Sequence, residues 1–146
     1  MAEPNSVIAF YDERVLSHQP DAKAPFPPGR MERRIRQLLS SLNKPWSYPE
    51  HAGRLTAIRH LLELEPIPGL HFECGRVATR EQLGRVHTST YLNHIFELRG
   101  KHAWLDVDTT AVSPGSIEAA EVAAGTAVAA VEAVLDDRAE SAFALV

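Results

Sequence analysis

The sequence predicts an α/β fold in which helices flank a parallel sheet. Short apolar segments rich in strand-forming residues lie near both ends of the chain, and segments with helical periodicity lie between them. Stretches rich in proline and glycine separate these segments. Strands that alternate with helices along the chain are typical of parallel sheets, which are buried between helical layers.

Three segments are expected to form strands: residues 6–11, 70–74 and 141–146. Each is short, apolar and bounded by polar or turn-forming residues, as buried strands are. The last of them reaches Val146, the final residue. Ligands of open α/β sheets bind in the loops beyond the carboxyl ends of the strands. Because the loop after residues 141–146 is missing, the sequence predicts an incomplete domain.

Apolar residues repeat at helical spacing in five segments, residues 31–42, 49–65, 79–87, 91–98 and about 114–136. Thr79 and Gln82 have the spacing of a capping box, and Ser113 before Pro114 predicts a hydroxyl cap followed by a first-turn proline. Residues 17–49 are otherwise loop-rich, and residues 101–112 are expected to form a loop.

The longest predicted helix, about residues 114–136, is dense in alanine. Small side chains let a helix lie close against its neighbours, so we expect this helix to be largely buried. Glu118, Glu121 and Glu132 within it argue against a membrane span.

Composition excludes several classes of protein. With 45% hydrophobic residues, 23% charged residues and a net charge of -4, the chain is an ordinary globular protein with no bias toward nucleic acid or an anionic membrane. Cys74 is the only cysteine, which excludes an intramolecular disulfide and a cysteine-rich zinc site. No apolar run approaches the ~18 residues of a membrane span. We therefore expect a cytoplasmic protein.

Four blocks of the sequence, in this order, resemble the histone deacetylase family, in particular its class II members and their bacterial amidohydrolase and acetylpolyamine amidohydrolase relatives. Each block is short, and it is their order and spacing that carry the resemblance. The blocks are Tyr48-Pro-Glu-His-Ala-Gly-Arg54; Arg76-Val-Ala-Thr79 with Val86-His-Thr88 and Tyr91; Asp106-Val-Asp-Thr109 with Ser113-Pro-Gly-Ser116; and Phe143-Ala-Leu-Val146. Residues 1–146 then correspond to the amino-terminal portion of a single deacetylase domain.

The resemblance implies a three-layer parallel sheet shared with arginases and a zinc-dependent hydrolysis of acetyl amides. In the family, two aspartates and a histidine hold the zinc, a histidine pair acts as general base and acid, and a tyrosine stabilises the oxyanion. All of these residues follow the position equivalent to Val146. The resemblance therefore implies zinc in the intact enzyme, no catalytic residue or metal ligand in this chain, and no activity of this chain alone.

Two aspartates are candidates for binding substrate. The resemblance matches Asp108 with a loop aspartate that holds the substrate backbone at the rim of the pocket, where a carboxylate accepts N–H bonds. Asp106 is the alternative in the same loop. Asp108 has a second interpretation, in which its side chain only forms a turn with Thr109 or Thr110.

Arg54 corresponds to the arginine at the inner end of the family's active-site channel, where a guanidinium suits an acetate product. The alternative is an arginine that ties loops together through backbone carbonyls. Some class II members bind a structural zinc with a histidine at the position of Tyr48, so we expect no structural zinc here. His87 is expected to be a cap or a packed core residue, and most of the other histidines, His18 included, to be solvated.

The expected substrate is acetylated lysine in a protein or an acetylated polyamine. Expected partners are the remainder of the catalytic domain and, as a further possibility, a second copy of the chain, with no nucleic acid and no membrane. The alternative function is a non-catalytic interaction module, or a split or degenerate homologue that pairs with another chain. An apolar final strand with nothing after it predicts aggregation.

Overall fold

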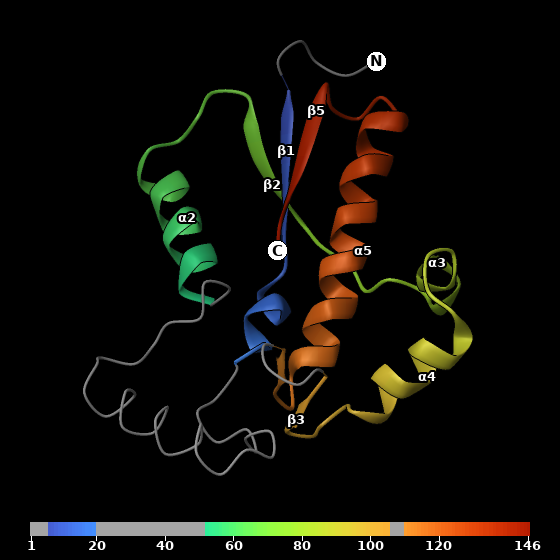
Figure 1. The fold of residues 1–146 in the computed structure, drawn as a ribbon. Helices are drawn as coiled ribbons and strands as arrows, with labels where there is room; N and C mark the ends of the chain where they lie inside the picture. Colours follow the sequence, from blue (N-terminus) through green and yellow to red (C-terminus); the bar gives the residue numbers. More distant parts are fainter. Residues whose placement is uncertain (1–5, 20–51, 106–109) are drawn as a thin grey trace, which may run out of the picture.

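The computed structural model describes residues 6–19, 52–105 and 110–146. A sheet of three parallel strands lies at its centre, in the order β2-β1-β5 (Figure 1). The sheet confirms all three predicted strands, which are β1 (Val7–Tyr11), β2 (Leu70–Cys74) and β5 (Ser141–Leu145).

The central strand β1 divides its side chains between the two faces of the sheet. Ala9 lies opposite Phe72 on one neighbouring strand and Phe143 on the other. Since side chains alternate along a strand, Ala9 shares its face with these aromatic residues, whereas Ile8 and Phe10 point to the opposite face. Ile8, Ala9 and Phe10 are at most 2% exposed, so β1 forms the core of the sheet.

Two helices cover opposite sides of the strands, α2 (Ala52–Leu64) and α5 (Ser116–Leu135) (Figure 1). On one face, Ile8 and Phe10 pack against Ala130 and Ala133 of α5. On the other face, the guanidinium of Arg59 in α2 lies 4.7 Å from the centre of the Tyr11 ring. The helix–sheet–helix arrangement confirms the predicted α/β fold.

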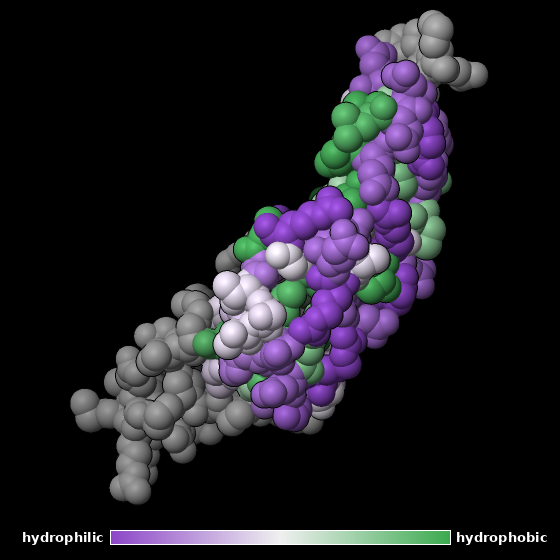
Figure 2. Space-filling model, turned by 90° about the vertical axis from the view of Figure 1, so that its right-hand side faces the viewer, coloured by the Kyte–Doolittle hydropathy of each residue, from purple (hydrophilic) through white to green (hydrophobic). Residues whose placement is uncertain are grey.

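Helix α5 is buried along one side only. Val122 and Thr126 are completely buried, and a side chain at Gly125 would collide with the backbone of residues 76–78. Val131 and Leu135, in the last turns, are 59% and 77% exposed. The expectation of a largely buried helix is therefore wrong for its carboxyl-terminal turns. On the face that carries α5, hydrophobic patches lie among mostly polar residues (Figure 2).

Two short helices follow β2, namely α3 (Arg80–Gly84) and α4 (Ser89–Glu97). The capping box predicted at the first is confirmed: Thr79 Oγ1 accepts from the backbone N–H of Gln82 at 3.1 Å, and Gln82 Oε1 accepts from that of Thr79 at 2.8 Å. Helix α3 ends earlier than expected, and Thr88 caps α4 in turn.

A 3-10 helix, η1 (Glu13–Ser17), follows β1 in a segment for which the sequence made no prediction. Two expectations about the connecting segments need correction. Residues 101–112, expected to be a loop, contain a pair of two-residue antiparallel strands, β3 (Ala103–Trp104) and β4 (Ala111–Val112). The N-cap of α5 is Gly115 rather than Ser113, since the Ser113 hydroxyl contacts Ser116 Oγ and accepts from the Gln19 N–H instead.

The last predicted strand is buried only in part. Leu145 is 4% exposed, but Phe143 is 39% exposed because β5 lies at an edge of the sheet formed by the described residues. The predicted helix of residues 31–42 and nearly all of the loop-rich residues 17–49 lie outside the described residues. Within the described ranges, no helix is long and apolar enough to cross a membrane.

Candidate functional site

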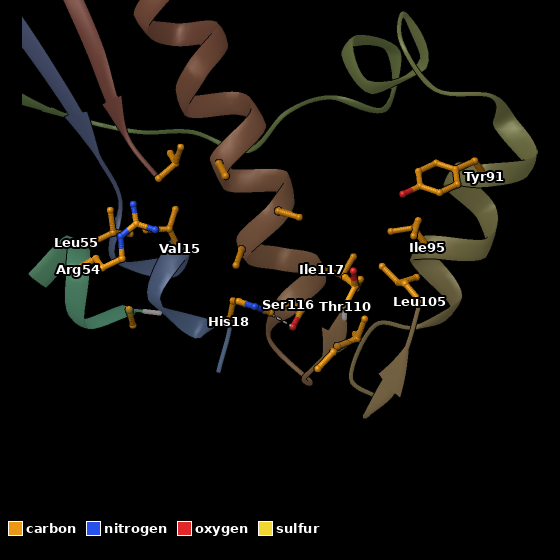
Figure 3. A pocket seen from close by; sticks show the side chains of 17 residues that line it. Val15, His18, Arg54, Leu55, Tyr91, Ile95, Leu105, Thr110, Ser116 and Ile117 are labelled. Carbon is orange, nitrogen blue, oxygen red and sulfur yellow. Dashed lines mark hydrogen bonds between the residues drawn. The ribbon is translucent and has the colours of Figure 1, made fainter. Parts of the chain in front are cut away.

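A cavity of about 380 Å³ lies beyond the carboxyl ends of β1 and β5 (Figure 3). This is the edge at which open α/β sheets bind their ligands. Its walls come from η1 and the residue after it, the first turn of α2, helix α4, the β3–β4 pair, the first turns of α5 and the residue after β5. Segments far apart in the sequence therefore meet here.

The walls of the cavity are mostly apolar. Small side chains of α5, those of Ala119, Ala120 and Ala123, leave the space open on one side. The polar residues in the lining are few, and they are Arg54, His18, Tyr91, Thr110 and Ser116. An apolar hollow with a few polar groups is typical of a site for a small organic ligand.

Arg54 lies in the first turn of α2 and lines the cavity, together with Leu55 (Figure 3). The resemblance implies an arginine beside a ligand channel, and the position of Arg54 in the cavity wall is compatible with this. Its role toward an acetate product stays a prediction.

Asp106 and Asp108 lie outside the described residues, so their roles also stay predictions. The residues that flank this segment, Leu105 and Thr110, both line the cavity. The backbone N–H of Leu105 donates to the carbonyl of Thr110 at 3.0 Å. The described residues on either side of the two aspartates thus lie in the cavity wall.

Most histidines of the group that contains His18 are expected to be solvated, and His18 is an exception. The ring is half-buried and lines the cavity, and its Nδ1 atom lies 2.7 Å from Ser116 Oγ. Burial lowers the pKa of His18. The contact joins residues separated by 98 positions, so periodicity offered no signal for it.

A second polar cluster lies at the carboxyl end of β1. Asp12 is 7% exposed and forms an ion pair with Arg14, whose Nη2 lies 2.7 Å from Asp12 Oδ2. The thiol of Cys74 donates to the same oxygen at 3.7 Å. The side-chain hydrogen bonds from Arg14 are the main cause that lowers the pKa of Asp12 to about 2.

The part of the chain that the structure describes holds no group of three or more histidine, cysteine, aspartate or glutamate residues able to bind a metal ion. Neither His18 nor the Asp12 cluster therefore fits the two-aspartate and histidine set that the resemblance implies for zinc. No step of the chemistry is assigned to a metal held by these residues.

Fold and cavity together define an α/β protein with a cavity at the carboxyl edge of a parallel sheet. Residues 48–146 match the family model of the histone deacetylase domain. The chain belongs to the histone deacetylase family, as the four sequence blocks predict.

Two similar proteins agree with this assignment. Histone deacetylase 8 of Arabidopsis thaliana is 35% identical over 101 residues, which make up 68% of this chain and 27% of that protein. The crystal structure of the HDA15 HD domain matches 97% of this chain with a TM-score of 0.71 and 26% sequence identity. The match covers 35% of the HDA15 chain, so this chain spans only about a third of its length.

Proposed function

We propose that these residues form the amino-terminal part of a zinc-dependent deacetylase domain that hydrolyses acetyl amides. The observation that carries the proposal is the cavity at the carboxyl edge of the sheet, lined by Arg54 within the region that matches the family model. An apolar cavity beside a guanidinium suits an acyl chain and its carboxylate product.

The catalytic metal belongs, in this proposal, to the remainder of the domain. Two observations support this division: the chain spans 27% of one relative and 35% of another, and its described residues hold no candidate metal cluster. Zinc, when bound, supplies Lewis-acid polarisation of the amide carbonyl and activation of water. The residues of this chain would hold the substrate and receive the product.

Each candidate residue has a separate task. Arg54 would bind the carboxylate of the released acetate by charge-assisted hydrogen bonds. Asp108, or Asp106 in its place, would accept N–H bonds from the backbone of the substrate at the rim of the cavity. The exposed side of Phe143 on β5 supports packing against the remainder of the domain, the partner that this function requires.

The substrate class follows from the polar groups that flank the acetyl amide. Acetylated lysine in a peptide offers backbone N–H groups that an aspartate can hold, whereas an acetylated polyamine offers cationic amines. We propose acetylated lysine as the substrate, since only it uses the backbone-binding role assigned to Asp108. We place the protein in the cytoplasm, in keeping with the single, unpaired Cys74.

The test uses the complete deacetylase domain that contains these residues. Acetate release is measured from an acetyl-lysine peptide and from N-acetylputrescine, with and without a zinc chelator. We expect faster chelator-sensitive release from the peptide. Equal rates with and without the chelator would contradict zinc dependence, and faster release from N-acetylputrescine would assign the polyamine substrate instead.

Variants of Arg54 test its assignment in the same assay. Arg54→Ala is expected to lower kcat/KM roughly tenfold or more, as expected for a lost hydrogen bond to a charged group. Arg54→Lys should restore part of the activity because it keeps the charge without the planar fork. Arg76→Ala is the matched control, since Arg76 pairs with Glu132 on the surface and does not line the cavity.

A further inference from the structure

A chain of hydrogen bonds runs from the segment after η1, through the start of α5, to the cavity. The backbone N–H of Gln19 donates to Ser113 Oγ at 3.1 Å. Ser113 Oγ lies 2.9 Å from Ser116 Oγ, which in turn lies 2.7 Å from Nδ1 of His18. Figure 3 shows the last contact beside the cavity. Two serines thus connect the Gln19 amide to an imidazole in the cavity wall.

The two serines are buried, so every polar hydrogen in this series of hydrogen bonds needs an acceptor. Ser113 is 3% exposed and Ser116 is 8% exposed. Ser116 Oγ also accepts from the backbone N–H of Ser113 at 2.7 Å. Among the described residues, the acceptor that the Ser113 hydroxyl hydrogen can reach is Ser116 Oγ.

The donors and acceptors present decide which atom donates in each of these hydrogen bonds. If Ser113 donates to Ser116, then Ser116 must use its own hydrogen elsewhere, and the neighbouring acceptor is Nδ1 of His18. Every hydroxyl hydrogen then has a partner. Nδ1 is an acceptor in this arrangement, which requires a neutral imidazole with its hydrogen on Nε2.

The opposite arrangement, in which Nδ1 of His18 is the donor, leaves one hydroxyl hydrogen without an acceptor among the described residues. If Nδ1 of His18 carried a hydrogen, it would donate to Ser116, and Ser116 would donate to Ser113. The hydroxyl hydrogen of Ser113 would then have no acceptor among the residues that the structure describes. A doubly protonated ring also carries a hydrogen on Nδ1, so it leaves the Ser113 hydroxyl hydrogen without an acceptor in the same way. Burial, which lowers the pKa of His18, favours the neutral ring independently.

We propose that the Ser113–Ser116 relay fixes His18 as the Nε2–H tautomer, and that this N–H is a hydrogen-bond donor for the carboxylate product in the cavity. The inference rests on the proposed function, which places acetate in the cavity. It adds His18 to Arg54 as a residue that binds the ligand. His18 follows η1 and Arg54 lies in α2, so the two residues line the cavity from different elements.

The elements that meet at the cavity beside His18 carry charged residues, among them Glu13 and Arg14 in η1, Arg54 in the first turn of α2 and Glu118 in the first turn of α5. Arg14 is already paired with Asp12. Burial is the cause that lowers the pKa of His18.

Nitrogen NMR of the complete deacetylase domain, labelled with ¹⁵N-histidine, tests the tautomer directly. Protonated and unprotonated ring nitrogens have well-separated shifts, and the exposed His94 and His102 serve as internal references. We expect a hydrogen on Nε2 and an unprotonated Nδ1 for His18 at neutral pH. A hydrogen on Nδ1 would overturn the proposal. Ser116→Ala should remove the preference for one tautomer, and an unchanged spectrum in that variant would equally overturn it.

Titration with acetate tests the second half of the proposal. The His18→Asn variant places an amide oxygen near the position of Nδ1, so it keeps an acceptor for Ser116 but has no donor in place of Nε2. We expect acetate to move the Nε2 signal of His18 in the unaltered complete domain. Acetate should bind roughly tenfold more weakly to the His18→Asn variant of that domain, which is the effect of one hydrogen bond to a charged ligand.

The outcomes separate this inference from the function on which it rests. Acetate that binds and depends on Arg54, but leaves the His18 signal and His18→Asn affinity unchanged, would overturn the role of His18 and leave the proposed function standing. Absence of deacetylase activity in the complete domain would overturn the proposed function. The tautomer measurement would then still stand as a statement about the relay.

Discussion

Asp12 and Arg14 form a two-point ion pair at the carboxyl end of β1. Arg14 Nε donates to Asp12 Oδ1 at 2.9 Å, and Nη2 donates to Oδ2 at 2.7 Å. The backbone N–H of Arg14 donates to Oδ1 as well, at 3.0 Å, so that Asp12 caps η1. The pair therefore fixes the segment that leads from the sheet to His18 and the cavity.

The ion pair predicts a loss of stability in acid. The hydrogen bonds from Arg14 lower the pKa of Asp12 from 3.8 to about 2. A carboxyl group whose pKa is lowered by folding stabilises the folded state above its unfolded pKa, and this contribution disappears as the pH falls from about 4 to about 2. The contribution at neutral pH is at most ~2 kcal/mol, and smaller because Arg14 is 44% exposed.

Urea unfolding at pH 6 and pH 3 measures this contribution. Asp12→Asn should lower the free energy of unfolding by about 1 kcal/mol at pH 6, and by less at pH 3. Glu13→Gln is the control, since Glu13 is the exposed neighbour. An equal loss for Asp12→Asn at both pH values would show that the carboxylate charge has no part in stability.

Gly125 predicts a severe effect of adding a single methyl group. A Cβ at this position would collide with the backbone of residues 76–78, which a flexible side chain could not relieve. Gly125→Ala should therefore destabilise the fold by ~1–3 kcal/mol or more, as substitutions that overpack a core do. Gly84→Ala is the matched control, because nothing lies within 4 Å of a Cβ there and alanine favours helix.

Thermal unfolding distinguishes the two glycine variants. The melting temperature of Gly84→Ala should equal or exceed that of the unaltered chain. If Gly125→Ala melted at the same temperature as Gly84→Ala, helix α5 would not lie as close to residues 76–78 as described.

Phe143 predicts self-association of the chain by itself. It is 39% exposed on β5, an edge strand of the described sheet, and an exposed apolar edge strand invites pairing with another chain. Phe143→Lys should shift the sedimentation profile toward the monomer. Leu135→Lys is the control, since Leu135 is 77% exposed but lies on α5 and away from the sheet edge. Equal effects of both changes would contradict a role for the edge strand.

The sequence predicted those features that depend on local pattern. Strands β1, β2 and β5 were found from short apolar runs, and the Thr79 capping box from the spacing of two residues. The β3–β4 pair was missed because two-residue strands have no periodicity. The Ser113 cap was predicted wrongly because the hydroxyl has partners elsewhere, in Gln19 and Ser116.

The site was less accessible to sequence reasoning than the fold. The resemblance implies that Arg54 lies at a ligand channel; the structure shows Arg54 in the wall of a cavity, and its role toward a ligand stays a prediction. His18 was missed because its partner, Ser116, is 98 positions away. Two serines three residues apart at the start of an alanine-rich helix are the local sign of the relay, and the sequence predicts only a helix cap at Ser113.

The central claim is that these residues build the scaffold and part of the substrate site of a deacetylase, and that the rest of the domain supplies the catalytic metal site. Acetate release from an acetyl-lysine peptide, measured with added zinc for the 146-residue chain and for the complete domain at equal concentration, tests it most directly. We predict release by the complete domain and none by the 146 residues alone. Zinc-dependent turnover by the chain itself would contradict the account.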